Sequence, residues 1–461
     1  MTIIPNQGNE LKSEQPYNEK SQLTSLSGCH LPTDGTSKKP GWFVSAFLVV
    51  NATLGVALLN FPKAYHEAGG VISALIVQSV FLVLVVFGLF IIIYCSDIKG
   101  SNTYQDVVLS LCGPKAQLAC AVCILVNCFG MCTTCLIIIH DQWELFFLNV
   151  SRELYCTTHP FYMARAFIIS ATSVLFILPL CFTKRIDFLK HSSVLGVIGC
   201  LYIAVLVAVK FFLHHDNQGK IATAPHSWID VFLVVPNICF AYACHVTIVP
   251  VYSSMAKRNM REFSKTVTLA MILCIITYTV TAALGYLQFG DNITNDILLS
   301  FNPTTDVMVA VVLVAVKTYT TYPIICFVGK TAFETLWRMF WKMSPDEILT
   351  REKTRRVITT LVWFTLTLLL SIFTPNIGVA IQILGANTAL LIFVFPGLCL
   401  LKTMENIIES DKNQPKEVRV LKWIGITYSV LGVFMFGLTL TQIIMKNIQG
   451  VKPDSSKFTC S

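Results

Sequence analysis

The decisive stretch of this sequence reads Val49-Val50-Asn51-Ala52-Thr53-Leu54-Gly55-Val56-Ala57-Leu58-Leu59-Asn60-Phe61-Pro62 and lies in the first long hydrophobic segment. Polar residues, a glycine and a proline interrupt what should be a continuous apolar helix. Unpaired backbone groups are costly inside a membrane, so the stretch predicts a broken helix whose freed amides and carbonyls line a cavity. In secondary transporters such breaks hold substrate and ion. The alternative is a kink packed against a neighbouring helix.

The composition places the chain among membrane proteins. Hydrophobic residues make up 54% and charged residues only 13% of the sequence, and the mean hydropathy is +0.66. These values lie far from those of soluble globular domains. Apolar runs long enough to cross a bilayer predict an all-α polytopic protein with eleven transmembrane helices, near residues 42–65, 70–95, 116–147, 163–182, 191–213, 228–255, 266–289, 305–327, 356–373, 377–400 and 420–445.

The distribution of charge argues against a nucleic-acid partner, although the net charge is +8. Most Lys and Arg lie in alternate loops, which predicts that those loops and the N-terminus are cytoplasmic. The same orientation places two glycosylation sequons, at Asn149 and Asn292, on the outer or lumenal side. The polar residues 1–40 have no apolar signal region, so we expect a disordered cytoplasmic tail.

The sixth segment repeats the anomaly of the first. Its centre, Phe240-Ala241-Tyr242-Ala243-Cys244-His245-Val246-Thr247-Ile248-Val249-Pro250, again places small and polar residues before a proline. Gly55 lies seven residues before Pro62, and Ala243 lies seven residues before Pro250. Ala243 follows Gly55 by 188 residues, and Pro250 follows Pro62 by the same distance. Interrupted helices at corresponding positions of two halves predict a five-plus-five inverted repeat with its binding site at the repeat interface.

Other polar residues fall at membrane depth and carry two interpretations each. His245 is a candidate binding residue or a neutral histidine bonded to a helix carbonyl, and Asn127 is a candidate or an interhelical hydrogen bond. Thr320 and Thr321 suggest a sodium site, because a hard cation prefers oxygen ligands, although threonine can also bond its own helix backbone. Cys244 and His245 do not indicate an enzyme, since adjacent helix residues do not face each other.

The quoted stretches together resemble the sodium-coupled neutral amino acid transporters of the amino acid/auxin permease group, within the amino acid–polyamine–organocation superfamily. Further matching motifs are Ala68-Gly69-Gly70, Val249-Pro250-Val251-Tyr252, Thr321-Tyr322-Pro323 and Ile392-Phe393-Val394-Phe395-Pro396-Gly397-Leu398-Cys399-Leu400. The similarity covers residues 42–445 and is greatest to the glutamine-handling branch. It implies alternating access in a transporter domain of residues 41–446, with repeats at 42–213 and 228–400, a peripheral helix at 420–445 and an outer tail at 447–461.

The resemblance also implies ligand positions. Amides of the first break would hold the substrate carboxylate, and backbone of the sixth helix would hold its ammonium group. Sodium would lie between first-helix carbonyls and eighth-helix hydroxyls, with no other cofactor. The expected substrate-binding residues are Ala52, Gly55, Val56, Asn127, Phe240, Tyr242, Ala243 and His245, and the expected sodium-binding residues are Val50, Asn51, Thr53, Thr320 and Thr321.

Lys317 departs from the family pattern, which would place a small neutral residue one turn before the threonines. Its side chain either snorkels toward the nearer interface or faces the cavity and repels sodium as a built-in cation that loses its proton during the cycle. We expect ordinary sodium coupling. The alternatives are sodium-independent or proton-coupled transport, and an amino acid sensor with the same fold. The plasma membrane is the expected location, with the lysosomal membrane as the alternative.

Overall fold

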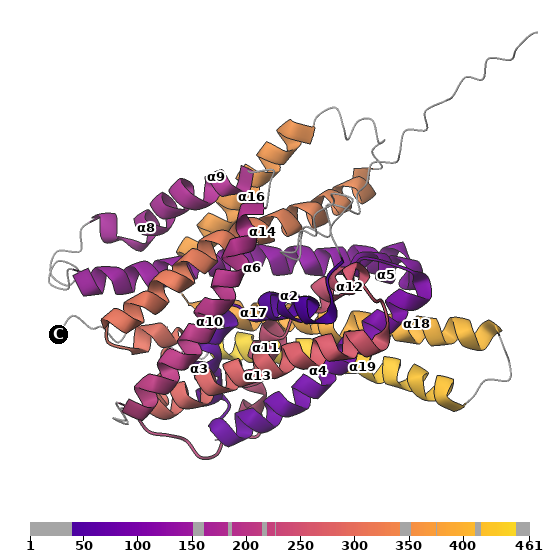
Figure 1. The fold of residues 1–461 in the computed structure, drawn as a ribbon, viewed down its shortest axis with the longest axis horizontal. Coiled ribbons are helices and arrows are strands. Elements are labelled where there is room, and N and C mark those ends of the chain that lie inside the picture. The colour runs from indigo at the N-terminus through magenta and orange to yellow at the C-terminus, as the bar shows by residue number, and fades with distance from the viewer. Residues whose placement is uncertain are drawn as a thin grey trace, which may run out of the picture.

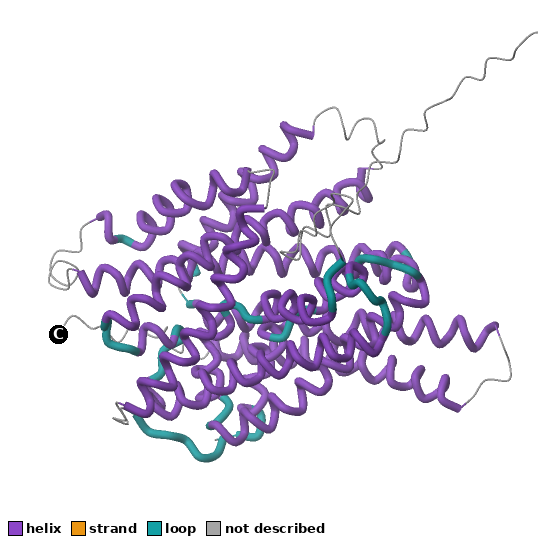
Figure 2. The backbone as a smooth tube through the Cα atoms, in the orientation of Figure 1, coloured by secondary structure: helices purple, strands orange, loops and turns teal. Residues whose placement is uncertain are grey.

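The computed structural model describes residues 39–150, 161–182, 187–213, 219–225, 227–341, 352–374, 376–410 and 416–448. Throughout these ranges the chain is helical and contains no strand (Figure 2). The helices are α2 (Trp42–Thr53), α3 (Ala57–Glu67), α4 (Val71–Lys99), α5 (Tyr104–Cys112), α6 (Pro114–Val150), η2 (Phe161–Met163), α8 (Arg165–Thr172), η3 (Ser173–Ile177), α9 (Leu178–Phe182), α10 (Asp187–Leu213), η4 (Asp230–Val234), α11 (Val235–Ala241), α12 (His245–Ser254), α13 (Met260–Phe289), η5 (Gly290–Asn292), η6 (Ile297–Ser300), α14 (Thr305–Trp341), α16 (Glu352–Phe373), α17 (Ile377–Ala389), η7 (Leu390–Val394), α18 (Phe395–Ser410) and α19 (Lys416–Ile448).

The number of membrane spans agrees with the hydropathy pattern. Ten helical runs among the described residues are long and apolar enough to cross a membrane, and the bent pair α2–α3 supplies an eleventh. One helix extends well beyond its predicted apolar run, because α14 continues to Trp341 whereas the run was predicted to end at residue 327. Helix hydrogen bonding continues past the point where the side chains become polar, so apolar length underestimates helix length.

Both predicted breaks are present, and they correspond residue for residue. The first helix is open at 54–56 and the sixth at 242–244, so the two breaks are of equal length and 188 residues apart. The segments α2 and α3 meet at an angle of 63°. The prolines lie beyond the breaks, since Pro62 and Pro250 are each the sixth residue of the second half-helix. Figure 1 shows α2, α11, α12 and α17 near the middle of the bundle.

The turn between the first two spans is formed at two glycines. Gly69 and Gly70 have φ values of 83° and 121°, a region that favours glycine. A Cβ on Gly69 would lie 2.3 Å from the Cα of Pro225. After α4 comes the short helix α5, and the hydroxyl of Thr103 caps it by accepting from the amide of Asp106 at 3.1 Å.

The cysteines of the described residues are unpaired and lie buried or half-buried among the helices. They therefore act as small apolar packing residues.

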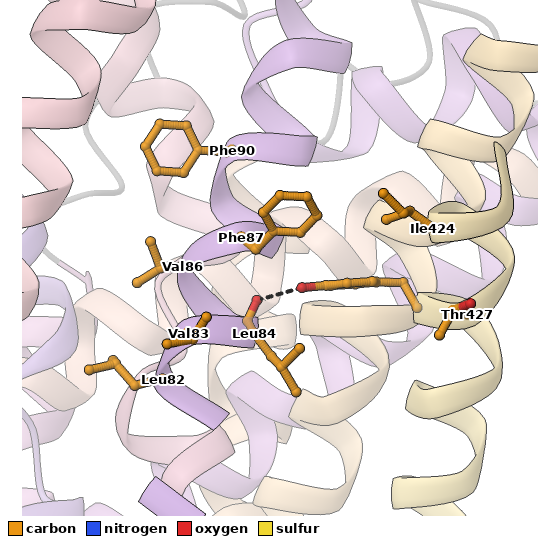
Figure 3. Close-up of a pocket in the computed structure, with 9 residues that line it drawn as sticks. Leu82, Val83, Leu84, Val86, Phe87, Phe90, Ile424 and Thr427 are labelled. Carbon is orange, nitrogen blue, oxygen red and sulfur yellow. Dashed lines mark hydrogen bonds between the residues drawn. The ribbon is translucent and has the colours of Figure 1, made fainter. Parts of the chain in front are cut away.

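An apolar groove of about 600 Å³ lies between α4 and α19 (Figure 3). The hydroxyl of Tyr428 crosses it to donate a 2.9 Å hydrogen bond to the carbonyl of Leu84. Its other lining residues are Leu82, Val83, Val86, Phe87, Phe90, Ile424 and Thr427. Because its lining is almost entirely apolar, this groove lacks the groups needed to bind an amino acid.

Candidate functional site

The first break is held open by side chains from other helices. The amide of Leu54 still bonds the carbonyl of Val50 at 2.7 Å, which completes the last turn of α2. Beyond it, the Tyr278 hydroxyl on α13 donates to the carbonyl of Thr53 at 2.8 Å and accepts from the amide of Gly55 at 3.3 Å. One phenol therefore pairs backbone groups on both sides of the bend.

The second break is closed mainly by its own backbone. The amide of Tyr242 bonds the carbonyl of Ile238 at 3.0 Å, and the amide of Cys244 bonds the carbonyl of Tyr242 at 2.9 Å. The Cys244 carbonyl then accepts from the amides of Thr247 and Ile248 at 3.1 and 2.9 Å. The first break has longer bonds of this kind, from the amides of Leu58 and Leu59 to the carbonyls of Gly55 and Val56, both at 3.2 Å. The second break therefore depends less on neighbouring helices.

Tyr278 joins the two breaks. Besides its contacts with the first break, its hydroxyl lies 3.4 Å from the carbonyl of Ala241, the last residue of α11. Its ring stacks on Phe61 of α3 with centroids 4.8 Å apart and meets Tyr242 edge-on at 5.3 Å. The carboxyl ends of α2 and α11 and the amino ends of α3 and α12 therefore converge. Such ends favour cations and anions respectively.

Most of the expected substrate residues line these breaks. Ala52, Gly55 and Ala243 are half-buried, whereas Val56, Phe240, Tyr242 and His245 are buried. A Cβ on Gly55 would meet no atom closer than the Thr53 carbonyl oxygen at 3.8 Å. The backbone at Gly55 therefore borders open space that a ligand could enter.

Two of these side chains turn toward α4. The Tyr242 hydroxyl accepts a 3.1 Å hydrogen bond from Gln78. His245 packs against Gly88, whose Cβ would lie 3.0 Å from Nε2, and neither ring nitrogen has a hydrogen-bond partner. Asn127 lies on α6 with its side-chain oxygen buried and unpaired. Asn127 therefore keeps a polar atom available to a partner, whereas the fully buried His245 ring faces α4, where the backbone of Val85 lies beside it.

The expected sodium ligands mostly have hydrogen-bond partners already. The carbonyls of Val50 and Thr53 accept the bonds described above, and the Thr53 hydroxyl donates to the carbonyl of Val49 at 2.7 Å. The Thr320 hydroxyl donates within α14 to the carbonyls of Val316 and Lys317, both at 2.9 Å. Asn51 and Thr321 are half-buried. Carbonyl oxygens keep a second lone pair, so these bonds still leave acceptor capacity for a cation.

Lys317 points into the first break. Its ammonium donates to the carbonyl of Leu54 at 2.7 Å and lies 2.9 Å from the sulfur of Cys200 on α10. Of the two orientations considered for this residue, the structure has the one that faces the cavity.

The half-helix α3 is tied to the loop that precedes η6. Asn60 donates from Nδ2 to the carbonyl of Asn295 at 2.8 Å, and Lys63 donates to the carbonyl of Ile293 at 3.1 Å. In the same loop, Asp296 accepts from Gln142 at 3.0 Å. Burial, together with the Asp141 carboxylate, raises the pKa of Asp296 to about 8.

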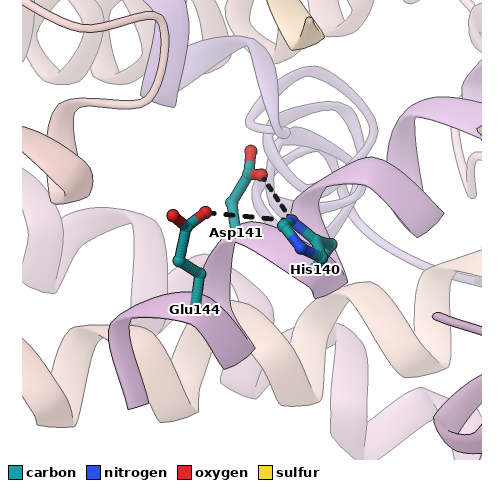
Figure 4. Close-up of side chains that lie close together, drawn as sticks. All are labelled: His140, Asp141 and Glu144. Carbon is teal, nitrogen blue, oxygen red and sulfur yellow. Dashed lines mark hydrogen bonds and ion pairs between the residues drawn. The ribbon is translucent and has the colours of Figure 1, made fainter. Parts of the chain in front are cut away.

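A cluster of charged side chains lies on α6 near this loop (Figure 4). The Nδ1 atom of His140 is 3.4 Å from Asp141 and 3.9 Å from Glu144. Three such ligands resemble a metal site. However, a guanidinium nitrogen of Arg165 lies 3.3 Å from the same Nδ1, and Arg165 also donates to the carbonyls of Ser371 and Thr374. The arginine therefore already supplies the positive charge, and the cluster ties α6, α8 and α16 together.

Sequence analysis assigned no role to three residues that hold these helices together: Tyr278, Gln78 and Arg165. Gln78 pairs with Tyr65, Tyr242 and Thr279, so it links α4 to three other segments. Each of these residues is polar within an apolar span, which is the signal that could have found them. Their partners lie far away in the sequence, so residue spacing alone could not have predicted these contacts.

The family model described as "Transmembrane amino acid transporter protein" matches residues 38–445. This chain belongs to that family. The sodium-coupled neutral amino acid transporter 7 of Danio rerio is 40% identical to it over 88% of this chain and 87% of the relative. The Homo sapiens protein of the same name is 40% identical over 87% of both chains. These findings confirm the family resemblance drawn from the motifs.

A solved structure supports the fold of this family member. The crystal structure of MhsT in complex with L-phenylalanine has a TM-score of 0.52 and 12% identity, and covers 87% of this chain and 98% of that one. At this identity the likeness shows the fold alone, which is the predicted inverted-repeat architecture with broken first and sixth spans. The chain is a multi-pass membrane transporter, and the family is not one of enzymes.

Proposed function

We propose that this chain carries small neutral amino acids such as glutamine across the membrane by alternating access, with sodium as the coupling ion. The observation that carries the proposal is the convergence of both helix breaks on Tyr278. Backbone amides near Gly55 would hold the substrate carboxylate, because a helix amino end favours an anion. Backbone between Phe240 and Ala243 would hold the ammonium group.

The side-chain candidates fit this proposal at the edges of the site. Ala52 and Val56 flank the first break, while Tyr242 and His245 flank the second. Asn127 offers an unpaired side-chain oxygen from α6, which suits an amide side chain such as that of glutamine.

The coupling ion is proposed at the carboxyl end of α2. Its ligands would be the carbonyls of Val50 and Thr53, the side chain of Asn51 and the hydroxyls of Thr320 and Thr321. The names of the relatives support sodium. The contact between Lys317 and Leu54 favours a second form of the same function, in which transport depends little on sodium or uses a proton.

The proposal is tested by uptake of radiolabelled glutamine into proteoliposomes containing the full chain, with and without a sodium gradient. Saturable uptake that other small neutral amino acids inhibit, and acidic or basic ones do not, is the expected result. Absence of uptake under every ion gradient would contradict the transporter proposal and favour an amino acid sensor.

A substitution at Gly55 tests the carboxylate site itself. A Cβ fits at this position without displacing protein atoms, so Gly55→Ala should leave thermal stability nearly unchanged, and Gly55→Val adds two further methyl groups at the same point. The larger side chain should abolish uptake by filling the space beside the unwound backbone, and the smaller one should weaken it. Unchanged substrate affinity in Gly55→Val would exclude this position from the site.

The location and modification of the chain follow from the same proposal. We place the N-terminus in the cytoplasm and the protein in the plasma membrane, with glycans at Asn149 and Asn292. Asn149 is exposed and Asn292 is half-buried, and the hydroxyl of Thr294 in the second sequon already bonds Asp296 and Ser300. Surface biotinylation and glycosidase digestion of single Asn→Gln variants measure both features.

A further inference from the structure

Lys317 occupies the point where the first helix opens. Its ammonium bonds the carbonyl of Leu54, the first residue after α2, at 2.7 Å. In the described part of the chain its other polar partner is the Cys200 sulfur at 2.9 Å. The cation therefore meets carbonyl and thiol groups, and none of the ion pairs found in that part includes it.

The neighbouring helix makes room for the lysine stem. Gly196 on α10 faces Lys317, and a Cβ at Gly196 would lie 3.1 Å from its Cγ and 3.2 Å from its Cδ. One turn away, Gly199 likewise faces Leu313, at 3.3 Å from Cβ to Cβ. The glycines let α10 and α14 approach closely, so the aliphatic stem passes between them toward the break.

The location suits a positive charge for a physical reason. The last carbonyls of α2 carry the negative end of the helix dipole, and unwound carbonyls add to it. These are the groups that coordinate a coupling cation in a broken transporter helix. Leu54 also adjoins Thr53 directly, and Thr53 is one of the proposed sodium ligands.

We propose that Lys317 is a tethered cation that occupies the coupling-ion position at the first break, so that sodium must compete with it. This inference rests on the proposed function, because it concerns the ion site of the same transporter. It accounts for three observations together: an ammonium that forms no ion pair within the described ranges, its bond to the break, and the glycine face that admits its stem. The consequence is transport with a weak sodium requirement.

The alternative is that the hydrogen bond from Lys317 to Leu54 only stabilises the shape of the break and its charge has no effect on sodium. A neutral side chain would then damage the site without creating sodium sensitivity. Charge and shape can be separated by two substitutions, because Lys317→Met keeps the length of the stem and removes the charge, whereas Lys317→Arg keeps the charge.

Lys330 provides a matched control on the same helix. It is also a buried lysine, and its ammonium bonds the Thr360 hydroxyl at 2.9 Å and the Cys181 carbonyl at 3.4 Å. It lies 13 residues further along α14, or about 20 Å. Lys330→Met therefore removes a buried charge from the helix without touching the break.

The test is a sodium titration of glutamine uptake in proteoliposomes, with the wild type and the three variants. We expect Lys317→Met to require at least about tenfold less sodium for half-maximal uptake, because like charges so close oppose each other strongly. Lys317→Arg and Lys330→Met should titrate like the wild type. Identical titrations of wild type and Lys317→Met would overturn the proposal, as would equal sensitisation by Lys330→Met.

A second measurement keeps this inference separate from the transport proposal. Sodium that binds the folded protein raises its melting temperature, so purified Lys317→Met should gain a sodium-dependent stabilisation that wild type lacks or shows only at higher concentration. This result would stand even if no variant transported glutamine. Lys317→Gln replaces Lys317→Met should the latter fail to fold, and a flat sodium response in both neutral variants refutes the tethered cation.

Discussion

The two helix breaks are equal in length and position but differ in what holds them. The break at 54–56 bends its helix by 63° and relies on Tyr278 and Lys317 from other helices. The break at 242–244 is closed by a local turn around the Cys244 carbonyl. The first break should therefore respond to changes in distant helices, while the second should behave as a fixed element.

The largest expected effect comes from forcing α11, the half-helix before the second break, away from α17. Gly385 on α17 lies against α11, and a Cβ there would stand 2.1 Å from the carbonyl oxygen of Pro236. Because the obstacle is backbone, Gly385→Ala should destabilise the fold by about 3 kcal/mol and reduce surface expression. Thermal unfolding in detergent measures this. Gly437→Ala is the control, since nothing lies within 4 Å of its Cβ. Equal stability of the two variants would show that α11 and α17 can move apart at little cost in free energy.

Tyr278→Phe should have the next largest effect and should act through the first break. It leaves the Thr53 carbonyl and the Gly55 amide without a partner, and because Gly55 is only half-buried we expect the two losses to cost about 2 kcal/mol together. We expect uptake to fall at least about tenfold with normal surface expression. The control Tyr286→Phe removes a hydroxyl two turns away that bonds the amide of Ala222 in a loop. If Tyr278→Phe took up substrate like the wild type, the first break would not depend on the hydroxyl that α13 supplies.

A change of pH should affect the stability of the region around the first break. Asp296 belongs to the loop whose carbonyls bind side chains of α3. Its raised pKa of about 8 means that the folded state holds a proton more tightly than the unfolded state. Protonated Asp296 therefore stabilises the folded state fully below the ordinary aspartate pKa of about 4, and this stabilisation is lost as the pH rises to about 8. The melting temperature should therefore fall with rising pH over that window.

Asp296→Asn should flatten this pH dependence, because an amide imitates the protonated acid. The unpaired Oε1 atom of Gln142 can accept its N–H after rotation of the Gln142 amide. A variant that keeps the wild-type slope would assign the pH dependence to another group.

The smallest effect is expected inside the second break. Thr247 donates its hydroxyl to the Cys244 carbonyl at 3.0 Å, but two backbone amides already bond the same oxygen. Thr247→Val should therefore change stability by less than about 1 kcal/mol and uptake by less than about twofold. Paired uptake measurements with Tyr278→Phe compare the breaks directly, and a loss as large as that of Tyr278→Phe would contradict the idea that this turn supports itself.

The sequence predicts the spans and the breaks well, because both follow from local composition. Small and polar residues in an apolar run identify the opening at Gly55, and the repeat distance transfers it to Ala243. The prolines do not mark the openings themselves, because Pro62 and Pro250 lie within the second half-helices. A proline kinks its own helix without ending it when neighbouring groups compensate.

The partners of the breaks were beyond sequence reasoning. Tyr278 is one of several aromatic residues in its span, and its role depends on the packing of α13 against both halves of the first helix. The orientation of Lys317 likewise depends on how α14 rotates against α10, which Gly196 permits. A single sequence contains the residues for such contacts but not the rotation that brings them together.

The buried cysteines make opening of the cavity measurable as a chemical rate. Cys244 lies within the second break and Cys200 beside the first, and both are shielded from solvent in this state. A water-soluble alkylating reagent can reach them only while the helices part, so the speed of labelling reports how often each side opens. Comparing the labelling rates of Cys244 and Cys200 would show which break becomes accessible to water more often.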